Sequence, residues 1–203
     1  MSDSGPRPID SLLAAYAART LSEPFAVLAA SHLQMKADNR AYITSLDAAD
    51  GTRFDAIVPV LNPNHERWPI STVEQMNVFM PLALRSYVSR HLGVLEWRTI
   101  LPGLKQCRIA RDARGDASFL RCRPGKAIPA HTHKGLEAVL VLQGGFRDAY
   151  GHYAPGDITV ADDTIDHRPV ADRSAECIIF VVLAAPVQLT GPFGRIIQRI
   201  FHT

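Results

Sequence analysis

The most informative part of this sequence is GKAIPAHTHKGLEAVLVLQG, residues 125–144. Three potential metal ligands, His131, His133 and Glu137, differ by even numbers. An extended chain therefore places all three side chains on one face of a sheet. Imidazole and carboxylate ligands together suit Zn, Fe, Ni, Cu or Mn. The spacing predicts a divalent metal site built on β-strands.

A second segment, YAPGDITVADDTIDHRPV (residues 153–170), supplies a fourth candidate ligand. His167 follows the turn Pro155-Gly156-Asp157, and an adjacent antiparallel strand can bring it back over the first three side chains. The nearby His152 stands before this turn, and we expect it to face solvent. We predict one divalent ion per chain, bound by His131, His133, Glu137 and His167. Zinc is the expected occupant, with iron, manganese or nickel as alternatives.

The chain changes its character near residue 93. After this point, short apolar runs such as ASFLRC (117–122), LEAVLVLQ (136–143) and AECIIFVVL (175–183) alternate with Gly and Pro turn signals. Such a series is typical of a sandwich or barrel. Before it, helical periodicity predicts helices from about residue 10, from Pro24 to about Asn39, over 40–49, and from about Pro81 to Gly93. Residues 50–69 indicate an irregular connector. We therefore expect a helical domain over 1–92 and an all-β domain over 93–203.

Composition excludes some classes of function. The chain has 203 residues, 47% of them hydrophobic, and a net charge of +2 without any Lys/Arg block. Direct nucleic-acid binding and binding to an anionic membrane surface are therefore not expected. No apolar run reaches the roughly 18 residues needed to span a bilayer, and the N-terminus lacks a signal-peptide pattern, so we expect a cytoplasmic protein. Cys107, Cys122 and Cys177 form no CxxC pair and are expected to be buried thiols.

The residues of the metal segment resemble the first motif of the cupin superfamily, which is a glycine, five residues, HxH, three or four residues, Glu, six residues and Gly. Every position of that motif is matched here, by Gly125, His131, His133, Glu137 and Gly144. In the second motif, Gly156 and His167 stand at the family's spacing. Other residues replace its usual Pro, Gly and Asn: Asp162, Thr164 and Ala171. The resemblance implies a jelly-roll β-barrel, and with it an α+β protein of two domains.

A helical domain followed by one cupin is similar to the ChrR-type anti-sigma factors, which hold an extracytoplasmic-function sigma factor inactive. The tracts that carry this resemblance are SLLAAYAARTL (11–21), LAASHLQMKADNRAYI (28–43) and GGFRDAYGHYAPGDI (144–158). The resemblance implies a transcriptional regulator. Its helical domain would bind a sigma factor, and its metal-bound cupin would sense a small molecule or an oxidant.

The helical domain departs from that family at its zinc ligands. The family uses a His before a Pro and then an HxxxCxxC motif, and the matching residues here are Arg7, His32, Lys36 and Asn39. Three of the four ligands are therefore missing, and a lone histidine cannot hold a tetrahedral zinc. We expect a degenerate site without zinc and a helical domain held by apolar packing. The candidates for that packing are Leu12, Leu13, Tyr16, Leu21, Phe25, Leu28, Leu33, Tyr42, Ile43 and Leu46.

Two other functions fit the same residues. A cupin with three histidines and one glutamate can be a metal-dependent enzyme of dioxygenase, hydrolase or isomerase type, or a plain metal-binding module. Tyr150, Arg123 and Gln143 are candidate cavity residues for a small-molecule ligand. Leu12, Leu13, Tyr16 and Leu28 lie on amphipathic segments that either face a partner or form an ordinary core. A homodimer is a further expected assembly.

Overall fold

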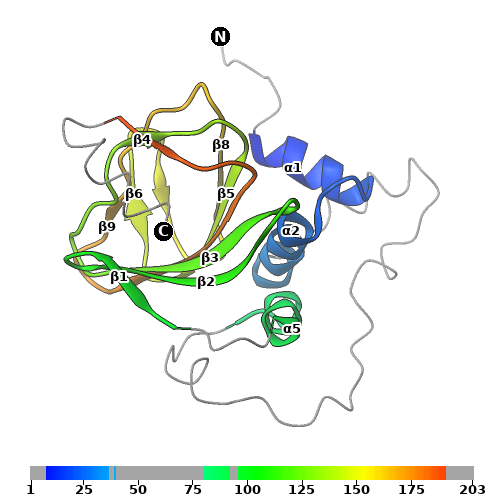
Figure 1. The fold of residues 1–203 in the computed structure, drawn as a ribbon, viewed down its shortest axis with the longest axis horizontal. Helices are drawn as coiled ribbons and strands as arrows, with labels where there is room; N and C mark the ends of the chain where they lie inside the picture. Colours follow the sequence, from blue (N-terminus) through cyan, green and yellow to red (C-terminus); the bar gives the residue numbers. More distant parts are fainter. Residues whose placement is uncertain (1–7, 37–38, 40–79, 92–95, 191–203) are drawn as a thin grey trace.

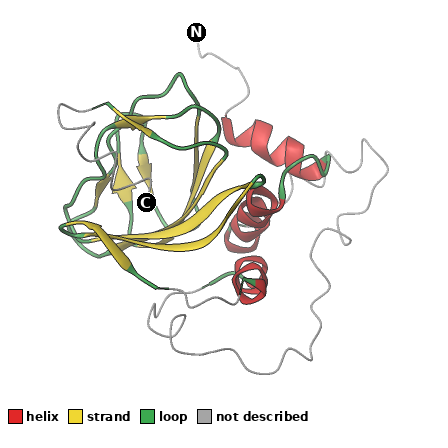
Figure 2. Cartoon of the chain, viewed as in Figure 1, coloured by secondary structure: helices red, strands yellow, loops and turns green. Residues whose placement is uncertain are grey.

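The computed structural model describes residues 8–36, 39, 80–91 and 96–190, and shows helices on one side of a β-sandwich (Figures 1 and 2). The helices are α1 (Pro8–Ala17), α2 (Glu23–Met35) and α5 (Leu82–Arg90). They confirm three of the predicted helices, and α2 and α5 end earlier than predicted. The helix predicted over 40–49 and the connector over 50–69 lie outside the described residues. None of the described helices is long and apolar enough to cross a bilayer.

The strands form one large and two small antiparallel sheets. The large sheet has the order β1-β2-β3-β10-β5-β8, and the small sheets are β7-β6-β9 and β11-β4. The strand bounds are β1 (Arg98–Leu101), β2 (Leu104–Asp112), β3 (Gly115–Cys122), β4 (His131–Thr132), β5 (Glu137–Gln143), β6 (Phe146–Arg147), β7 (His152–Tyr153), β8 (Ile158–Ala161), β9 (Val170–Ala171), β10 (Cys177–Leu183) and β11 (Gln188–Leu189).

The central strands of the large sheet are buried on both faces. In β5, Val139 and Val141 pack with Phe146 between the sheets, whereas Leu140 and its alternate neighbours pack on the opposite face. In β10, Ile179 and Phe180 divide between the two faces in the same way. This double burial explains why both strands are continuous apolar runs and do not alternate with polar residues.

The helices share one hydrophobic core with the outer face of the large sheet. Leu28 of α2 and Phe180 of β10 are both fully buried in that core, together with Leu84 of α5. Figure 1 shows α2 lying against the sheet, with α1 and α5 on either side of it. The predicted two-domain arrangement with a separate helical bundle is therefore not confirmed. The boundary predicted at residue 92 falls among residues 92–95, outside the described residues.

The β part is an open sandwich, and the closed barrel that we predicted is not found among the described strands. The sheets meet through a few backbone contacts, which include isolated bridges at Ala127–Val170 and at His131–His167. The short strands of the small sheets, two residues each, cannot extend the ladder far enough to close it. The cupin-like fold itself is confirmed.

Apolar packing of the helices is as predicted. Leu13 and Leu33 meet in a cluster between α1 and α2, and Phe25 joins the core over the sheet. The buried candidates are Leu12, Leu13, Tyr16, Phe25, Leu28 and Leu33, and Leu21 is partly buried. Tyr42, Ile43 and Leu46 lie outside the described residues. The four residues weighed as a partner-binding face are all among the buried ones, so the ordinary-core alternative describes them.

Candidate metal centre

Backbone pairing brings the two histidine segments together. His131 begins β4, and its N–H donates to the carbonyl of His167 at 3.1 Å. The N–H of His167 donates back to the carbonyl of His131, also at 3.1 Å. This antiparallel bridge places His167 beside the first motif, as predicted from the sequence.

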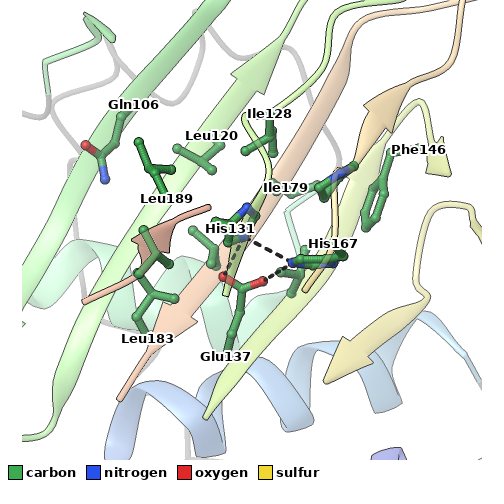
Figure 3. Close-up of a pocket in the computed structure, with 14 residues that line it drawn as sticks. Gln106, Leu120, Ile128, His131, Glu137, Phe146, His167, Ile179, Leu183 and Leu189 are labelled. Carbon is green, nitrogen blue, oxygen red and sulfur yellow. Dashed lines mark hydrogen bonds and ion pairs between the residues drawn. The ribbon is translucent and has the colours of Figure 1, made fainter. Parts of the chain in front are cut away.

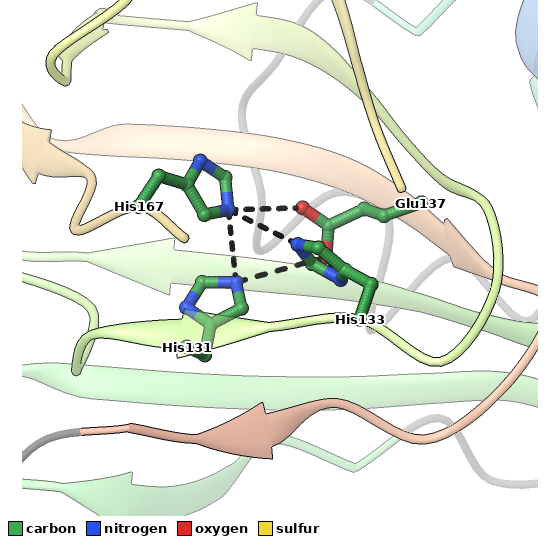
Figure 4. Close-up of side chains that lie close together, drawn as sticks. All are labelled: His131, His133, Glu137 and His167. Atoms are coloured by element: carbon green, nitrogen blue, oxygen red, sulfur yellow. Dashed lines mark hydrogen bonds and ion pairs between the residues drawn. The ribbon is translucent and has the colours of Figure 1, made fainter. Parts of the chain in front are cut away.

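The four predicted ligands converge on one point (Figure 4). One nitrogen or oxygen atom from each side chain lies within 4.8 Å of the others. His167 Nε2 is 3.0 Å from His131 Nε2 and 3.3 Å from His133 Nε2. The side chains are buried, and we call this group the His₃Glu cluster: His131, His133, Glu137 and His167. Ligand atoms about 2.0–2.2 Å from a tetrahedral ion are about 3.3–3.6 Å apart, close to the distances between these histidine nitrogens.

The hydrogen bonds around the cluster fit a bound cation. His131 Nδ1 donates to the carbonyl of Pro129 at 2.8 Å, and His167 Nδ1 donates to Asp148 Oδ2 at 3.1 Å. These bonds assign the proton to Nδ1 in both rings, so two unprotonated Nε2 atoms face each other. Among the described residues, the buried Nδ1 of His133 has no hydrogen-bond partner and lies 3.7 Å from Glu137 Oε2. The facing Nε2 lone pairs of His131 and His167 are accommodated by a positive ion between the rings.

The protonation states also suit a metal. Burial lowers the pKa of His131 and of His133, so both imidazoles are neutral near pH 7. Burial by itself raises the pKa of Glu137, but the adjacent imidazoles outweigh it and lower that pKa. Burial lowers the pKa of His167 as well, whereas the hydrogen-bonded carboxylates of Glu137 and Asp148 raise it overall. The cluster thus offers imidazole nitrogens and one carboxylate, a donor set for first-row divalent ions.

A small cavity of about 60 Å³ opens on the cluster (Figure 3). Its polar residues are His131, Glu137, His167 and Gln106, and the rest of its lining is apolar. The apolar lining comprises Leu120, Ile128, Val139, Phe146, Pro169, Ile179, Val181, Leu183, Val187 and Leu189. The expected cavity residues Tyr150, Arg123 and Gln143 do not line it, and Tyr150 is 58% exposed. Gln106 was missed, although it stands two residues after the inward-facing Leu104 on the same strand.

Comparison with known proteins identifies the family. A family model described as the ChrR Cupin-like domain matches residues 86–186. The anti-sigma-E factor ChrR of Cereibacter sphaeroides is 34% identical over an alignment of 204 positions, which covers 95% of this chain and 96% of that protein. This chain belongs to the ChrR family. The crystal structure of Rhodobacter sphaeroides SigE in complex with the anti-sigma ChrR matches with a TM-score of 0.65 and 37% identity, over 86% of this chain and 96% of that chain.

The positions that correspond to zinc ligands in ChrR-type helical domains have other contacts here. His32 Nδ1 donates to the carbonyl of Gly156 at 2.6 Å, and Asn39 Nδ2 donates to His32 Nε2 at 2.7 Å. The ammonium of Lys36 lies 3.2 Å from Asp157 Oδ1. Arg7 lies outside the described residues. Both ring nitrogens of His32 are therefore engaged by protein groups, and α2 is joined to the turn before β8.

Among the residues that the structure describes, the other histidines and the three cysteines are not part of the cluster. His152 is exposed, as predicted, and its Nε2 is 2.7 Å from Asp172 Oδ2. His91 Nδ1 donates to the carbonyl of Tyr87 at 2.9 Å, whereas His65 and His202 lie outside the described residues. All three cysteines are buried free thiols, as predicted. Burial raises the pKa of Cys107 and of Cys122 to about 11 and that of Cys177 to about 12.

Proposed function

We propose that this chain is an anti-sigma factor that holds a sigma factor of the extracytoplasmic-function class inactive. The similarity to the anti-sigma-E factor ChrR, over 95% of this chain and 96% of that protein, carries this proposal. The match to the SigE–ChrR complex supports this proposal. The match covers 86% of this chain, more than the β part from β1 to β11, so it includes helical residues as well. In this proposal the sigma factor contacts the helical part, residues 1–92.

We further propose that the cupin part, residues 93–203, holds one divalent ion in the His₃Glu cluster. Three imidazoles and one carboxylate make a four-ligand set, which supports zinc as the occupant, with iron, manganese or nickel as alternatives. When bound, such an ion acts as a Lewis acid toward a ligand that enters the cavity. The protein contributes buried histidines, a buried carboxylate and an apolar cavity lining.

The size of the cavity limits the ligand at the cluster to a small molecule. Pockets for drug-sized ligands have volumes of about 300–1,000 Å³. The cavity at the cluster is only about 60 Å³, which admits a molecule of a few non-hydrogen atoms. A small molecule or oxidant that binds at the metal would change regulation only if it binds the sigma-bound and free states with different affinity.

The test is co-purification of the full-length chain with a sigma factor. The full chain is needed because α1, α2 and α5 share their core with the sheet, so the helical residues alone would leave that core exposed. Two probes are suitable: SigE of Rhodobacter sphaeroides and the sigma factor encoded nearest to this chain. A housekeeping sigma factor is the control. We expect a stable complex, seen by size-exclusion chromatography with light scattering, and loss of sigma-dependent transcription in vitro.

A folded, metal-loaded chain that binds neither probe at micromolar concentration would overturn the anti-sigma proposal. The same light-scattering measurement tests the predicted homodimer, because it gives the mass of the chain before the sigma factor is added.

A further inference from the structure

Asp148 is a buried acid on an exposed loop. It lies between β6 and β7, where its neighbour Tyr150 is largely exposed, yet its side chain is only 2% exposed. Burying a carboxylate without partners costs free energy, so a buried acid on a surface loop is expected to have hydrogen-bond donors around it. The partners of Asp148 explain its position.

The two carboxylate oxygens of Asp148 have different partners. Oδ1 accepts from the backbone N–H of Tyr150 at 2.9 Å and from that of Gly151 at 3.1 Å. Oδ2 accepts from Nδ1 of His167 at 3.1 Å. The first oxygen holds the loop in shape, and the second contacts a member of the His₃Glu cluster.

We propose that Asp148 is the positioning residue of the metal centre. By accepting a hydrogen bond from Nδ1–H of His167, it keeps the ring proton on Nδ1 and directs the Nε2 lone pair toward the other ligands. Partners of this kind orient a ligating histidine and increase its basicity. This inference rests on the metal-binding part of the proposed function.

The rings of His131 and His167 are oriented by different kinds of partner. Nδ1 of His131 donates to the carbonyl of Pro129, two residues earlier, so the orientation of this ring comes from the local backbone. His167 receives the equivalent contact from a side chain 19 residues away. The pairing of β6 with β9 brings Asp148 and His167 together. Arg147, next to Asp148, lies opposite Val170, which follows His167 by three residues.

The decisive variant is Asp148→Asn. The backbone N–H groups of Tyr150 and Gly151 require an acceptor, so they hold the amide oxygen at the Oδ1 position. The amide NH₂ then faces His167, donates to Nδ1 and moves the ring proton to Nε2, where it blocks metal binding. We expect the affinity for Co(II) and Zn(II), measured by competition with a chelator, to fall about 10- to 100-fold. The Co(II) absorption spectrum should change, and the melting temperature of the metal-free protein should stay near that of wild type.

Asp172→Asn is the matched control. It removes the same charge beside the same small sheet, but the described side-chain partners of Asp172 are His152 and Arg147, which are outside the cluster. Its metal affinity and Co(II) spectrum should match those of wild type. If Asp172→Asn weakens binding as much as Asp148→Asn does, net charge explains the effect and the inference fails.

Asp148→Ala separates tautomer control from a purely structural role. It loses the loop hydrogen bonds but has no amide to force the wrong tautomer, so it should bind Co(II) more tightly than Asp148→Asn. The reverse order would show that Asp148 only supports the loop. Equal affinity and equal spectra for wild type and Asp148→Asn would overturn this inference alone. A folded wild-type chain that binds no Co(II) or Zn(II) would overturn the proposed metal function and this inference with it.

Discussion

His32 of α2 donates a 2.6 Å hydrogen bond from Nδ1 to the carbonyl of Gly156, in the turn before β8. This histidine stands at a position where the resemblance to ChrR-type proteins implies a zinc ligand. Its second nitrogen accepts from Asn39, and one turn later Lys36 pairs with Asp157. The helix lies so close to the turn that a Cβ on Gly156 would come within 2.9 Å of the Lys36 side chain. Residues at zinc-ligand positions thus attach the helix to the cupin.

Replacing His32 by Ala should destabilise the protein by about 1–3 kcal/mol, because the buried Gly156 carbonyl loses its partner. Chemical denaturation gives this free energy of unfolding. His91→Ala is the matched control, since the hydrogen bond that the structure describes for His91 stays within its own segment, to the carbonyl of Tyr87, and its loss should cost less. Lys36→Ala should cost at most about 1 kcal/mol, because the ion pair with Asp157 is about a third exposed. Equal losses for the two histidine variants would contradict the role given to His32.

The same histidine predicts a pH dependence of stability. Burial lowers the pKa of His32 from its usual 6.5, against the opposing effects of the Gly156 carbonyl and Asp157 and with a small further lowering by Lys36. Between the lowered pKa and 6.5, the unfolded chain binds a proton that the folded chain does not. The contribution of His32 is therefore complete above pH 6.5 and is lost as the pH falls below it, by at most about 1.4 kcal/mol per pH unit.

This contribution can be isolated by comparing wild type with His32→Ala from pH 7.5 to pH 5. Other buried histidines affect both proteins equally, so they cancel in the difference. We expect the gap between the two free energies of unfolding to narrow as the pH falls. A gap that stays constant over this range would contradict the prediction.

The shared core predicts that helices and sheet unfold together. Leu28 is fully buried between α2 and the sheet, so Leu28→Ala should cost about 2–5 kcal/mol. Far-UV circular dichroism and tryptophan fluorescence should report one coincident transition. Leu82→Ala is the control, because Leu82 lies on α5 with 40% exposure and should change stability by less than about 0.5 kcal/mol. Two separate transitions in wild type would instead support independent domains.

The two glycines of the first cupin motif should differ in their tolerance of alanine. Gly125 has φ +70° and Gly144 has φ +67°, so either substitution places a side chain in the left-handed region, at about 1–2 kcal/mol. A Cβ at Gly125 would meet only Arg173 Cγ at 3.5 Å, whereas one at Gly144 would overlap the carbonyl oxygen of Glu176. Gly144→Ala should therefore cost roughly 1–3 kcal/mol more than Gly125→Ala in a denaturant titration. Similar losses would show that the turn at Gly144 relaxes freely.

Metal content should depend on the histidines of the cluster. The double variant His131→Ala/His133→Ala removes two of the four donors, and elemental analysis should find almost no bound metal. Chelator should lower the melting temperature of wild type and leave that of the double variant unchanged. His152→Ala should keep its metal, because His152 is exposed and bonds to Asp172. Full retention of metal by the double variant would refute the assigned site.

The four members of the His₃Glu cluster could be selected from the sequence because their information is local. His131, His133 and Glu137 lie within seven residues, and the alternation of a strand places their side chains on one face. His167 was found by its distance from the Gly156 turn. The described helices also followed from local periodicity, since apolar residues three and four apart require a covered face.

Periodicity states that a helix face is buried but not what covers it. For Leu12 and Leu28 the sequence left two alternatives open, a surface for a partner protein and an ordinary core. The structure shows the ordinary core, because both residues pack against the outer face of the large sheet. The continuous apolar runs of β5 and β10 required a cover on that face as well, and the helices supply it.

The places of Asp148 and Gln106 at the site could be found only from the tertiary structure. Asp148 is joined to His167 by the pairing of β6 with β9, and Gln106 reaches the cavity because β2 lies two strands from β10 in the sheet. Neither residue stands at a motif spacing, since strand pairing is decided by long-range contacts that a linear pattern does not encode. The local spacing of the sequence identifies the candidate ligands. Their orientation and the cavity beside them depend on which strands become neighbours in the folded chain.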